Sequence, residues 1–496
     1  MTVTAATASN AERFIQAGFI KCVPRPNDRF FLAQELPVAK DKSPPSPILA
    51  LSENFVNCLD VRARLSSSEE REKRDVLWLF QDKPQMDVSS GILDYMDPQG
   101  VLQAFLASQK ETASWKIVDR SDSRLEIRLH SQTWQGIEWQ HDLLIHLPKT
   151  EIFPGIVVLE ITGGDVNSLD VGRAQIASEA LGAPVATLFH IPNQPLWDRV
   201  EDDLIAHTLE ECLNTSDPTW PLLFPMVQAV QAAMDAIRAH LGPNPRFILT
   251  GASKRGWTAW LAGLHLEGVM AIAPRVYDNL NVPEQMAGQL RLWGDYSPKI
   301  DDYTRRSLQQ TLDSAAGQAM ARSIDPYTYL SGNDVPVFIH LGSHDEYWRP
   351  DASRFYWNEI EGPKAILVQP NEPHGIGDAA WDKPGFIESL RWLAAEKPLP
   401  LVSMQLVDDE IAFEIAAPLQ KWTAYRSESP TSWFGTSVWQ IAGTGDTGRG
   451  SIKPASHDQY EGYLIVAETS EGTMFGVPPM IIYKGQDLAS DLSHKQ

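Results

Sequence analysis

The chain has 496 residues, of which 43% are hydrophobic and 21% charged, and its formal net charge is −22. This length and composition are typical of a globular protein of two or three domains with enough apolar side chains for a sizeable core. The strong negative charge argues against a nucleic-acid ligand and an anionic membrane surface, because both would be repelled. No segment approaches the roughly 18 uninterrupted apolar residues of a membrane span. The first residues also lack the apolar stretch of a secretory signal, so we expect a cytoplasmic protein.

Residues 1–92 show no chemical motif, and we describe them as an N-terminal extension of unknown role. Between residues 124 and 147 polar and apolar side chains alternate, which predicts two half-exposed strands. Residues 155–161 are nearly all apolar, as in a strand covered on both faces. From there to residue 368 such strands alternate with helical segments. The pattern predicts a doubly wound, mostly parallel sheet of the α/β-hydrolase type over residues 93–399.

Two segments interrupt this alternation, at about residues 197–225 and 278–333. Both follow strand ends, where ligands bind in open α/β sheets, so they form either a cap over the site or extra packing helices. After residue 399 the chain changes to short strands divided by turns, one of them expected at 433–441, and residues 400–496 predict a small β-sandwich. The G-x-G-x-x-G match at 443–448 has no helix after it to receive a phosphate, and we interpret it as a hairpin loop.

The central motif is Gly251-Ala252-Ser253-Lys254-Arg255-Gly256. An apolar strand ends just before it and a helix-compatible segment follows it. A sharp strand–turn–helix of this kind exposes a nucleophilic serine in α/β-hydrolases. The usual pattern is G-x-S-x-G, whereas here Arg255 takes the place of the second glycine and Gly256 follows it.

A serine nucleophile needs a base and an acid that orients the base, and in α/β-hydrolases these follow in the order Ser, acid, His, each after a strand. Asp345 follows the predicted strand 335–341, and His374 follows the predicted strand 364–368. Glu346 and Asp351 are the alternative acids. The histidine pair at 340 and 344 has i, i+4 spacing but straddles a strand end, so we expect no metal site there.

Acyl transfer also needs donors for the oxyanion. We expect one to be the backbone N–H of Lys254 and the other that of Gly163 or Gly164, in the loop after the predicted strand 155–161. The Lys254 and Arg255 side chains either contact the substrate or pair with acidic neighbours such as Asp278 or Asp165. Further candidates for substrate contacts are aromatic: Trp348, Trp293, and the Trp197 and Trp220 of the first insertion.

Several of these stretches resemble one protein family. They are the Ser253 motif continued to Trp260, residues 273–281, 300–306, 345–348 and 370–375, and residues 203–208. From about residue 93 onward the chain resembles the PhoPQ-activated pathogenicity-related family. The resemblance implies an α/β-hydrolase-like domain with a β-rich C-terminal region, and it places the Ser, Asp and His of the family on Ser253, Asp345 and His374. Members are often exported, whereas this chain shows no signal. The Ser-Lys-Arg-Gly elbow is also similar to that of glucuronoyl esterases, in which a basic residue after the serine helps the oxyanion.

The sequence therefore predicts a serine hydrolase of the esterase or peptidase type, acting on a small-molecule or peptide substrate without a cofactor or metal. The alternative is a non-catalytic binding or signalling protein on the same scaffold. The family's name describes regulation rather than a reaction and leaves the substrate open.

Overall fold

The computed structural model describes residues 21–25, 29–33, 98–109, 112–455 and 459–482. The chain divides into two compact parts. The first includes the antiparallel pair β1 (Lys21–Arg25) and β2 (Arg29–Ala33). The rest of the predicted N-terminal extension lies outside the described residues. The second part runs from residue 96 onward, apart from residues 313–316, and contains the candidate site.

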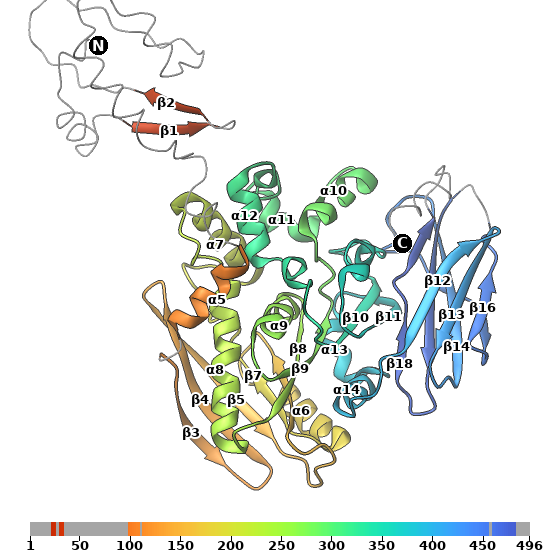
Figure 1. Cartoon of the computed structure of the whole chain (residues 1–496), viewed down its shortest axis with the longest axis horizontal. Coiled ribbons are helices and arrows are strands. Elements are labelled where there is room, and N and C mark those ends of the chain that lie inside the picture. The colour runs from red at the N-terminus through yellow and green to blue at the C-terminus, as the bar shows by residue number, and fades with distance from the viewer. Residues whose placement is uncertain (1–20, 26–28, 34–97, 110–111, 456–458, 483–496) are drawn as a thin grey trace, which may run out of the picture. The chain divides into compact units, whose positions relative to one another are not determined.

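The second part is built on a fourteen-stranded mixed sheet (Figure 1). Its centre is parallel and has the spatial order β7 (Val185–Leu188), β6 (Ile156–Ile161), β8 (Arg246–Ala252), β9 (Val269–Arg275), β10 (Val337–His344), β11 (Lys364–Pro373). Next to β7 lies an antiparallel edge of β5 (Ile137–His146), β4 (Arg124–Trp134) and β3 (Ser114–Arg120). Each of the six parallel strands contains a run of buried, mostly apolar residues, as expected for a sheet covered on both faces. The predicted α/β-hydrolase-like sheet is confirmed.

Helices connect the parallel strands. The chain moves from β6 to β7 through α6 (Ser168–Leu181) and, in the opposite direction, from β8 to β9 through α9 (Lys254–His265). Because such crossovers are right-handed, α6 and α9 lie on opposite faces of the sheet. Helix α14 (Phe386–Ala394) packs beside α6, while α8 (Leu223–Leu241) packs beside α9 and α5 (Pro98–Ser108). Short helical turns follow β10 and β11: η5 (Ala352–Phe355), η6 (Trp357–Glu359), α13 (Ile376–Ala379) and η7 (Ala380–Asp382).

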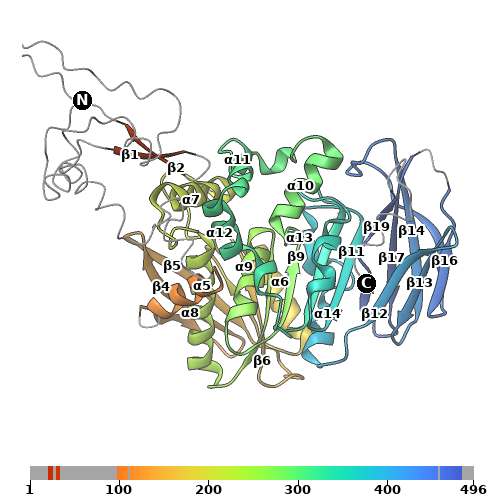
Figure 2. The same ribbon diagram turned by 45° about the horizontal axis from the view of Figure 1, so that its top comes forward.

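The two predicted insertions are largely helical. The first contains α7 (Glu201–Thr215), and the second contains α10 (Val282–Trp293), η2 (Pro298–Ile300), α11 (Asp301–Thr304), η3 (Gln309–Asp313), α12 (Ala315–Ile324) and η4 (Pro326–Tyr329). Figures 1 and 2 show α7, α10 and α11 gathered at one end of the sheet. The parallel strands finish at that end. Ser253, Asp345 and His374 directly follow the last residues of β8, β10 and β11, so all three lie there.

The C-terminal strands extend the same sheet. The short strand β18 (Met474–Gly476) pairs with β11 through Ile366 and Gly476, and beyond it lie β17 (Tyr460–Glu468), β14 (Lys421–Ser429) and β15 (Gln440–Gly445), with β19 (Met480–Ile482) on β17. A second, three-stranded sheet of β12 (Leu401–Val407), β13 (Glu410–Ala416) and β16 (Arg449–Ile452) packs on them, and the Phe413 and Trp422 rings meet edge to face at 4.9 Å. This gives the predicted β-rich C-terminal region.

Two local predictions in this region are wrong. The strand expected at 433–441 begins only at Gln440, because Phe434 and Trp439 are both buried and the backbone N–H of Trp439 donates to the Asn371 side chain at 2.7 Å. The loop at 446–448 is not a hairpin, since it joins β15 and β16 of different sheets. Within the described part of the chain, no helix has both the length and the apolar character needed to cross a membrane.

Candidate functional site

Ser253 occupies a strained turn between β8 and α9. Its backbone angles are φ 56° and ψ −124°, a region that non-glycine residues rarely adopt and that occurs preferentially at functional sites. The turn requires glycine on both sides. A Cβ at Gly251 would lie 2.6 Å from the Arg255 carbonyl oxygen, and a Cβ at Gly256 would lie 2.9 Å from the Arg275 carbonyl oxygen. The displaced second glycine therefore still permits the close approach of α9 to the neighbouring strand.

Three predicted residues meet at the ends of three parallel strands. His374 Nε2 lies 3.0 Å from Ser253 Oγ, and His374 Nδ1 lies 2.7 Å from Asp345 Oδ2. A carboxylate only accepts hydrogen bonds, so Nδ1 carries the proton and the Nε2 lone pair faces the serine hydroxyl. The Tyr347 N–H donates to the other Asp345 oxygen at 2.9 Å and fixes the carboxylate. The alternative acids lie elsewhere: Glu346 accepts the His374 backbone N–H at 3.1 Å, and Asp351 pairs with Arg349 at 2.8 Å.

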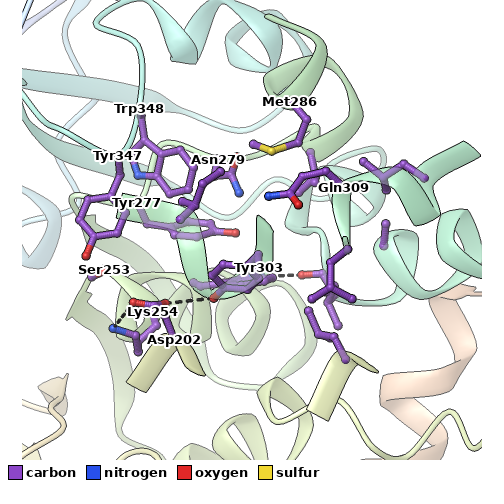
Figure 3. A pocket seen from close by; sticks show the side chains of 18 of the residues that line it. Asp202, Ser253, Lys254, Tyr277, Asn279, Met286, Tyr303, Gln309, Tyr347 and Trp348 are labelled. Carbon is purple, nitrogen blue, oxygen red and sulfur yellow. Dashed lines mark hydrogen bonds and ion pairs between the residues drawn. The ribbon is translucent and has the colours of Figure 1, made fainter. Parts of the chain in front are cut away.

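Tyr347 is a site residue that the sequence analysis missed. Its ring packs on the His374 imidazole at a centroid distance of 4.2 Å, and Figure 3 shows its hydroxyl end directed at Ser253. Burial, together with nearby carboxylates such as Asp202, raises the pKa of Tyr347 to about 12. The phenol therefore stays protonated at neutral pH and can donate a hydrogen bond. Its position two residues after the predicted acid was the only signal in the sequence.

The side chains of Lys254 and Arg255 are held by carboxylates of α7. Arg255 donates to both oxygens of Glu201 at 2.7 Å, and Lys254 Nζ lies 2.8 Å from Glu201 and 3.1 Å from Asp202. Burial alone would raise the pKa of Glu201, but the hydrogen bonds and charges of Arg255 and Lys254 outweigh it and hold that pKa well below its ordinary value. Of the two alternatives left open by the sequence, ion pairing is what the structure has, although the partners are not the suggested Asp278 or Asp165.

The predicted oxyanion donors lie near one another in the fold. β6 and β8 are adjacent, with Ile161 in register with Gly251, so the loop carrying Gly163 and Gly164 follows β6 beside the elbow. Lys254 is the first residue of α9, and its N–H lacks an intrahelical acceptor, as at any helix start. Among the described residues, neither Gly163 nor Gly164 donates its N–H to a protein acceptor. Gly163 also has a packing role, because a Cβ there would lie 1.7 Å from the Arg255 guanidinium.

A cavity of about 100 Å³ opens beside Ser253 (Figure 3). Most of its wall is apolar and comes from the second insertion, including Met286, Ile300, Leu312 and Met320. On its floor, the Asp202 carboxylate and the Lys254 ammonium form an ion pair, and Asp202 also accepts the Tyr303 hydroxyl at 3.0 Å. The cavity therefore carries no net charge from these groups.

Of the aromatic residues predicted to contact the substrate, Trp348 lines this cavity, and Trp293, Trp197 and Trp220 do not. In contrast to the prediction, Arg255 is directed away to Glu201 and to the Ile191 carbonyl, 2.6 Å from its Nε. Trp293 instead donates its indole N–H to the Ser432 carbonyl at 3.2 Å, which ties α10 to the C-terminal region. Trp197 and Trp220 pack against each other at 5.6 Å and against Trp134.

The described residues contain no group of three or more histidine, cysteine or acidic side chains that could hold a metal ion. The two histidines with i, i+4 spacing each have a protein partner. His340 Nε2 lies 3.0 Å from Ser389 Oγ, and His344 Nε2 donates to the Ser437 carbonyl at 2.7 Å.

Comparisons with known proteins agree with the sequence resemblance. Over 273 residues the chain is 32% identical to the autocrine proliferation repressor protein A of Dictyostelium discoideum; the match covers 50% of this chain and spans only 55% of that relative's length. Similar solved structures include an acetyl xylan esterase from Paenibacillus sp. R4, with 14% identity and a TM-score of 0.42 over 62% of this chain and 99% of that one. A glucuronoyl esterase from Solibacter usitatus has 11% identity and a TM-score of 0.40 over 59% of this chain and 91% of that one. The family model of the PhoPQ-activated pathogenicity-related proteins matches residues 102–432, and the chain belongs to this family.

Proposed function

We propose that this chain is a serine hydrolase of the esterase or peptidase type, with Ser253 as its nucleophile. The observation that carries the proposal is the unbroken chain of contacts from Ser253 Oγ through His374 to Asp345, at 3.0 and 2.7 Å. A serine hydroxyl is a weak nucleophile unless a base removes its proton, and this arrangement supplies an oriented base. The strained backbone of Ser253 supports the same interpretation.

In this mechanism the Ser253 oxygen attacks a carbonyl carbon while His374 Nε2 takes the hydroxyl proton. The carbonyl oxygen becomes an oxyanion, which the N–H groups of Lys254 and of Gly163 or Gly164 stabilise, as the free donors at these positions allow. His374 then gives its proton to the leaving alcohol or amine, and the carbon–heteroatom bond breaks to leave an acyl-serine. Water, deprotonated by the same imidazole, attacks the acyl-serine and restores the hydroxyl. Asp345 holds the imidazole and stabilises its charged form.

Covalent labelling with a fluorophosphonate tests the proposal, because this reagent reacts with an activated serine. We expect a single adduct on Ser253 that is absent from Ser253→Ala, whereas the control Ser123→Ala, in the exposed bend before β4, labels like the wild type. Parallel assays with p-nitrophenyl esters and peptide p-nitroanilides separate the esterase from the peptidase. A folded protein that neither labels nor hydrolyses any of these refutes the proposal. That result would favour the binding or signalling alternative, to which the name of the Dictyostelium relative corresponds.

A further inference from the structure

The cavity beside Ser253 contains polar atoms that no protein group satisfies. Within the described part of the chain, the Tyr277 hydroxyl, Asn279 Oδ1 and Gln309 Oε1 are buried and lack a hydrogen-bond partner of normal geometry. All three residues line the cavity, and they are only 3%, 8% and 8% exposed. In Figure 3 the Tyr277 hydroxyl and the two amide ends point into the same space beneath Met286. A buried polar atom without a partner costs about 1–3 kcal/mol, so three in one place require an explanation.

Neighbouring contacts fix the chemistry that Gln309 presents. Its Nε2 lies 3.1 Å from Thr304 Oγ1, and the Thr304 hydroxyl donates its single proton to the Ile300 carbonyl at 3.2 Å. Thr304 can therefore only accept from Gln309, which assigns the amide nitrogen to that contact and leaves the oxygen as the unpaired atom. Another buried amide of the same insertion is fully used: Gln289 donates to the Tyr347 carbonyl at 3.0 Å and accepts from the Ser297 N–H at 2.9 Å.

Tyr277 is rigid and protonated. Its ring stacks on Trp257 at 5.2 Å and meets Trp348 edge to face at 6.3 Å. Burial raises the pKa of Tyr277 well above its ordinary value. The hydroxyl lies near the Asn279 side chain but can still donate its proton. The cavity thus offers two amide acceptors and one phenol donor in an otherwise apolar wall.

We propose that the substrate part bound in this cavity carries a hydroxyl group, which donates to Gln309 or Asn279 and accepts from Tyr277. This inference rests on the proposed function. A carboxylate or phosphate would face two amide oxygens without a free cation, since Lys254 is paired with Glu201 and Asp202. A plain hydrocarbon would leave the three polar atoms unsatisfied. A hydroxyl is the smallest neutral group that both donates and accepts.

The kinetic test compares three p-nitrophenyl esters that share a six-carbon acyl chain: hexanoyl, 6-hydroxyhexanoyl and 6-methoxyhexanoyl. A second series places the same groups on the alcohol side of acetate esters. At about 1.4 kcal/mol per tenfold, satisfying one buried acceptor predicts a kcat/KM about tenfold higher for the hydroxyl ester in at least one series. The methoxy ester can accept from Tyr277 but cannot donate to an amide oxygen, so it gains less than the hydroxyl ester. Replacing the amide that accepts from the substrate hydroxyl, by Gln309→Leu or Asn279→Leu, brings the ratio of kcat/KM for the hydroxyl ester over the unsubstituted ester close to one. The exposed Gln318→Leu leaves that ratio and the activity as in the wild type.

A protein that labels at Ser253 but shows no preference for the hydroxyl ester in either series overturns this inference and leaves the proposed function intact. A second experiment does not depend on catalysis. It uses Ser253→Ala protein and compares the binding of hexane-1,6-diol with that of its dimethyl ether by ligand-observed NMR. Tighter binding of the diol, lost in Ser253→Ala/Gln309→Leu, supports the hydroxyl site even if no substrate is turned over. Equal binding of the two ligands overturns it.

Discussion

Replacing Glu201 by glutamine tests whether α7 holds the elbow through its carboxylate. In the wild type the two Glu201 oxygens accept from both terminal nitrogens of Arg255 at 2.7 Å, from Lys254 at 2.8 Å and from Gln194 at 2.5 Å. Glutamine retains one acceptor oxygen and places an NH2 group against a guanidinium. The remaining neutral oxygen can accept from only part of these donors. The contacts that are not changed are the bond from Arg255 to the Ile191 carbonyl and the ion pair of Lys254 with Asp202.

The expected loss of stability follows from burial. Breaking a fully buried ion pair costs about 3–5 kcal/mol, because the remaining charge lacks a partner. The Lys254 and Arg255 side chains are only 9% and 12% exposed, but that of Glu201 is 40% exposed, so solvent screens part of the interaction. We therefore expect Glu201→Gln to lower the free energy of unfolding by about 1–3 kcal/mol. In a domain of this size each kcal/mol lowers Tm by about 2 °C.

The pH dependence adds a second test. The pKa of Glu201 is depressed in the folded state, so its contribution is complete above the unfolded pKa of about 4.3 and is lost only as the pH falls below that value. The Tm difference between wild type and Glu201→Gln should thus be constant from pH 6 to pH 8. Calorimetry measures it, and kcat/KM on a p-nitrophenyl ester reports whether the elbow shifts.

Glu396→Gln is the matched control. Glu396 also binds an arginine with both oxygens, at 2.8 and 2.7 Å from Arg246, but the two side chains are 59% and 47% exposed. An exposed pair contributes at most about 1 kcal/mol, so this variant should unfold within about 2 °C of the wild type. If Glu201→Gln lowers Tm no more than Glu396→Gln does and leaves kcat/KM unchanged, the network does not support the elbow.

Three further substitutions address the site and its surroundings. Asp345→Asn should lower kcat by about 10³–10⁴ with an unchanged Tm, because an amide favours the wrong His374 tautomer; steady-state kinetics with less than tenfold loss would contradict the assignment of the acid. Tyr347→Phe should lower kcat by about tenfold or more with little change in KM if its hydroxyl donates in the transition state, and a change in KM alone would argue for substrate binding only. For Asp278, burial raises the pKa to about 8, so the folded state retains a proton that the unfolded chain loses near pH 4, and stability falls as the pH rises toward 8. The Tm of Asp278→Asn relative to wild type should therefore increase from pH 5 to pH 8, and a constant difference would refute the raised pKa.

The sequence predicted the parts of the site that depend on strand ends. Ser253, Asp345 and His374 each follow a buried parallel strand, and parallel strands end at one edge of a sheet, so their convergence follows from topology. The partners of Lys254 and Arg255 could not be predicted in the same way. Glu201 lies 54 residues before Arg255 and begins a helix of an insertion, whose position depends on packing rather than on strand order.

The C-terminal region shows a different limit of prediction. Alternating or apolar residues at 433–441 suggested a strand, yet Trp439 is buried and its backbone N–H donates to Asn371, so this segment contacts the last residues of β11. Likewise, the pairing of the three-residue β18 with β11 joins the C-terminal strands to the main sheet. Contacts between distant segments decide both features, and periodicity does not report such contacts.

The elbow departs from the usual G-x-S-x-G pattern at Arg255, which takes the place of the second glycine and binds Glu201. A glycine two residues after the serine normally lets the helix approach the sheet, and here Gly256 provides that approach one residue later, against the Arg275 carbonyl. Arg255 therefore does not need to be a glycine. Its guanidinium occupies the space that a Cβ on residue 163 would need, and it binds Glu201. The glycines at 163 and 256 and the arginine between the elbow and α7 thus form one interdependent arrangement. This arrangement connects the serine turn, the loop expected to supply an oxyanion donor and the first insertion. A substitution in any one of the three should therefore shift the other two.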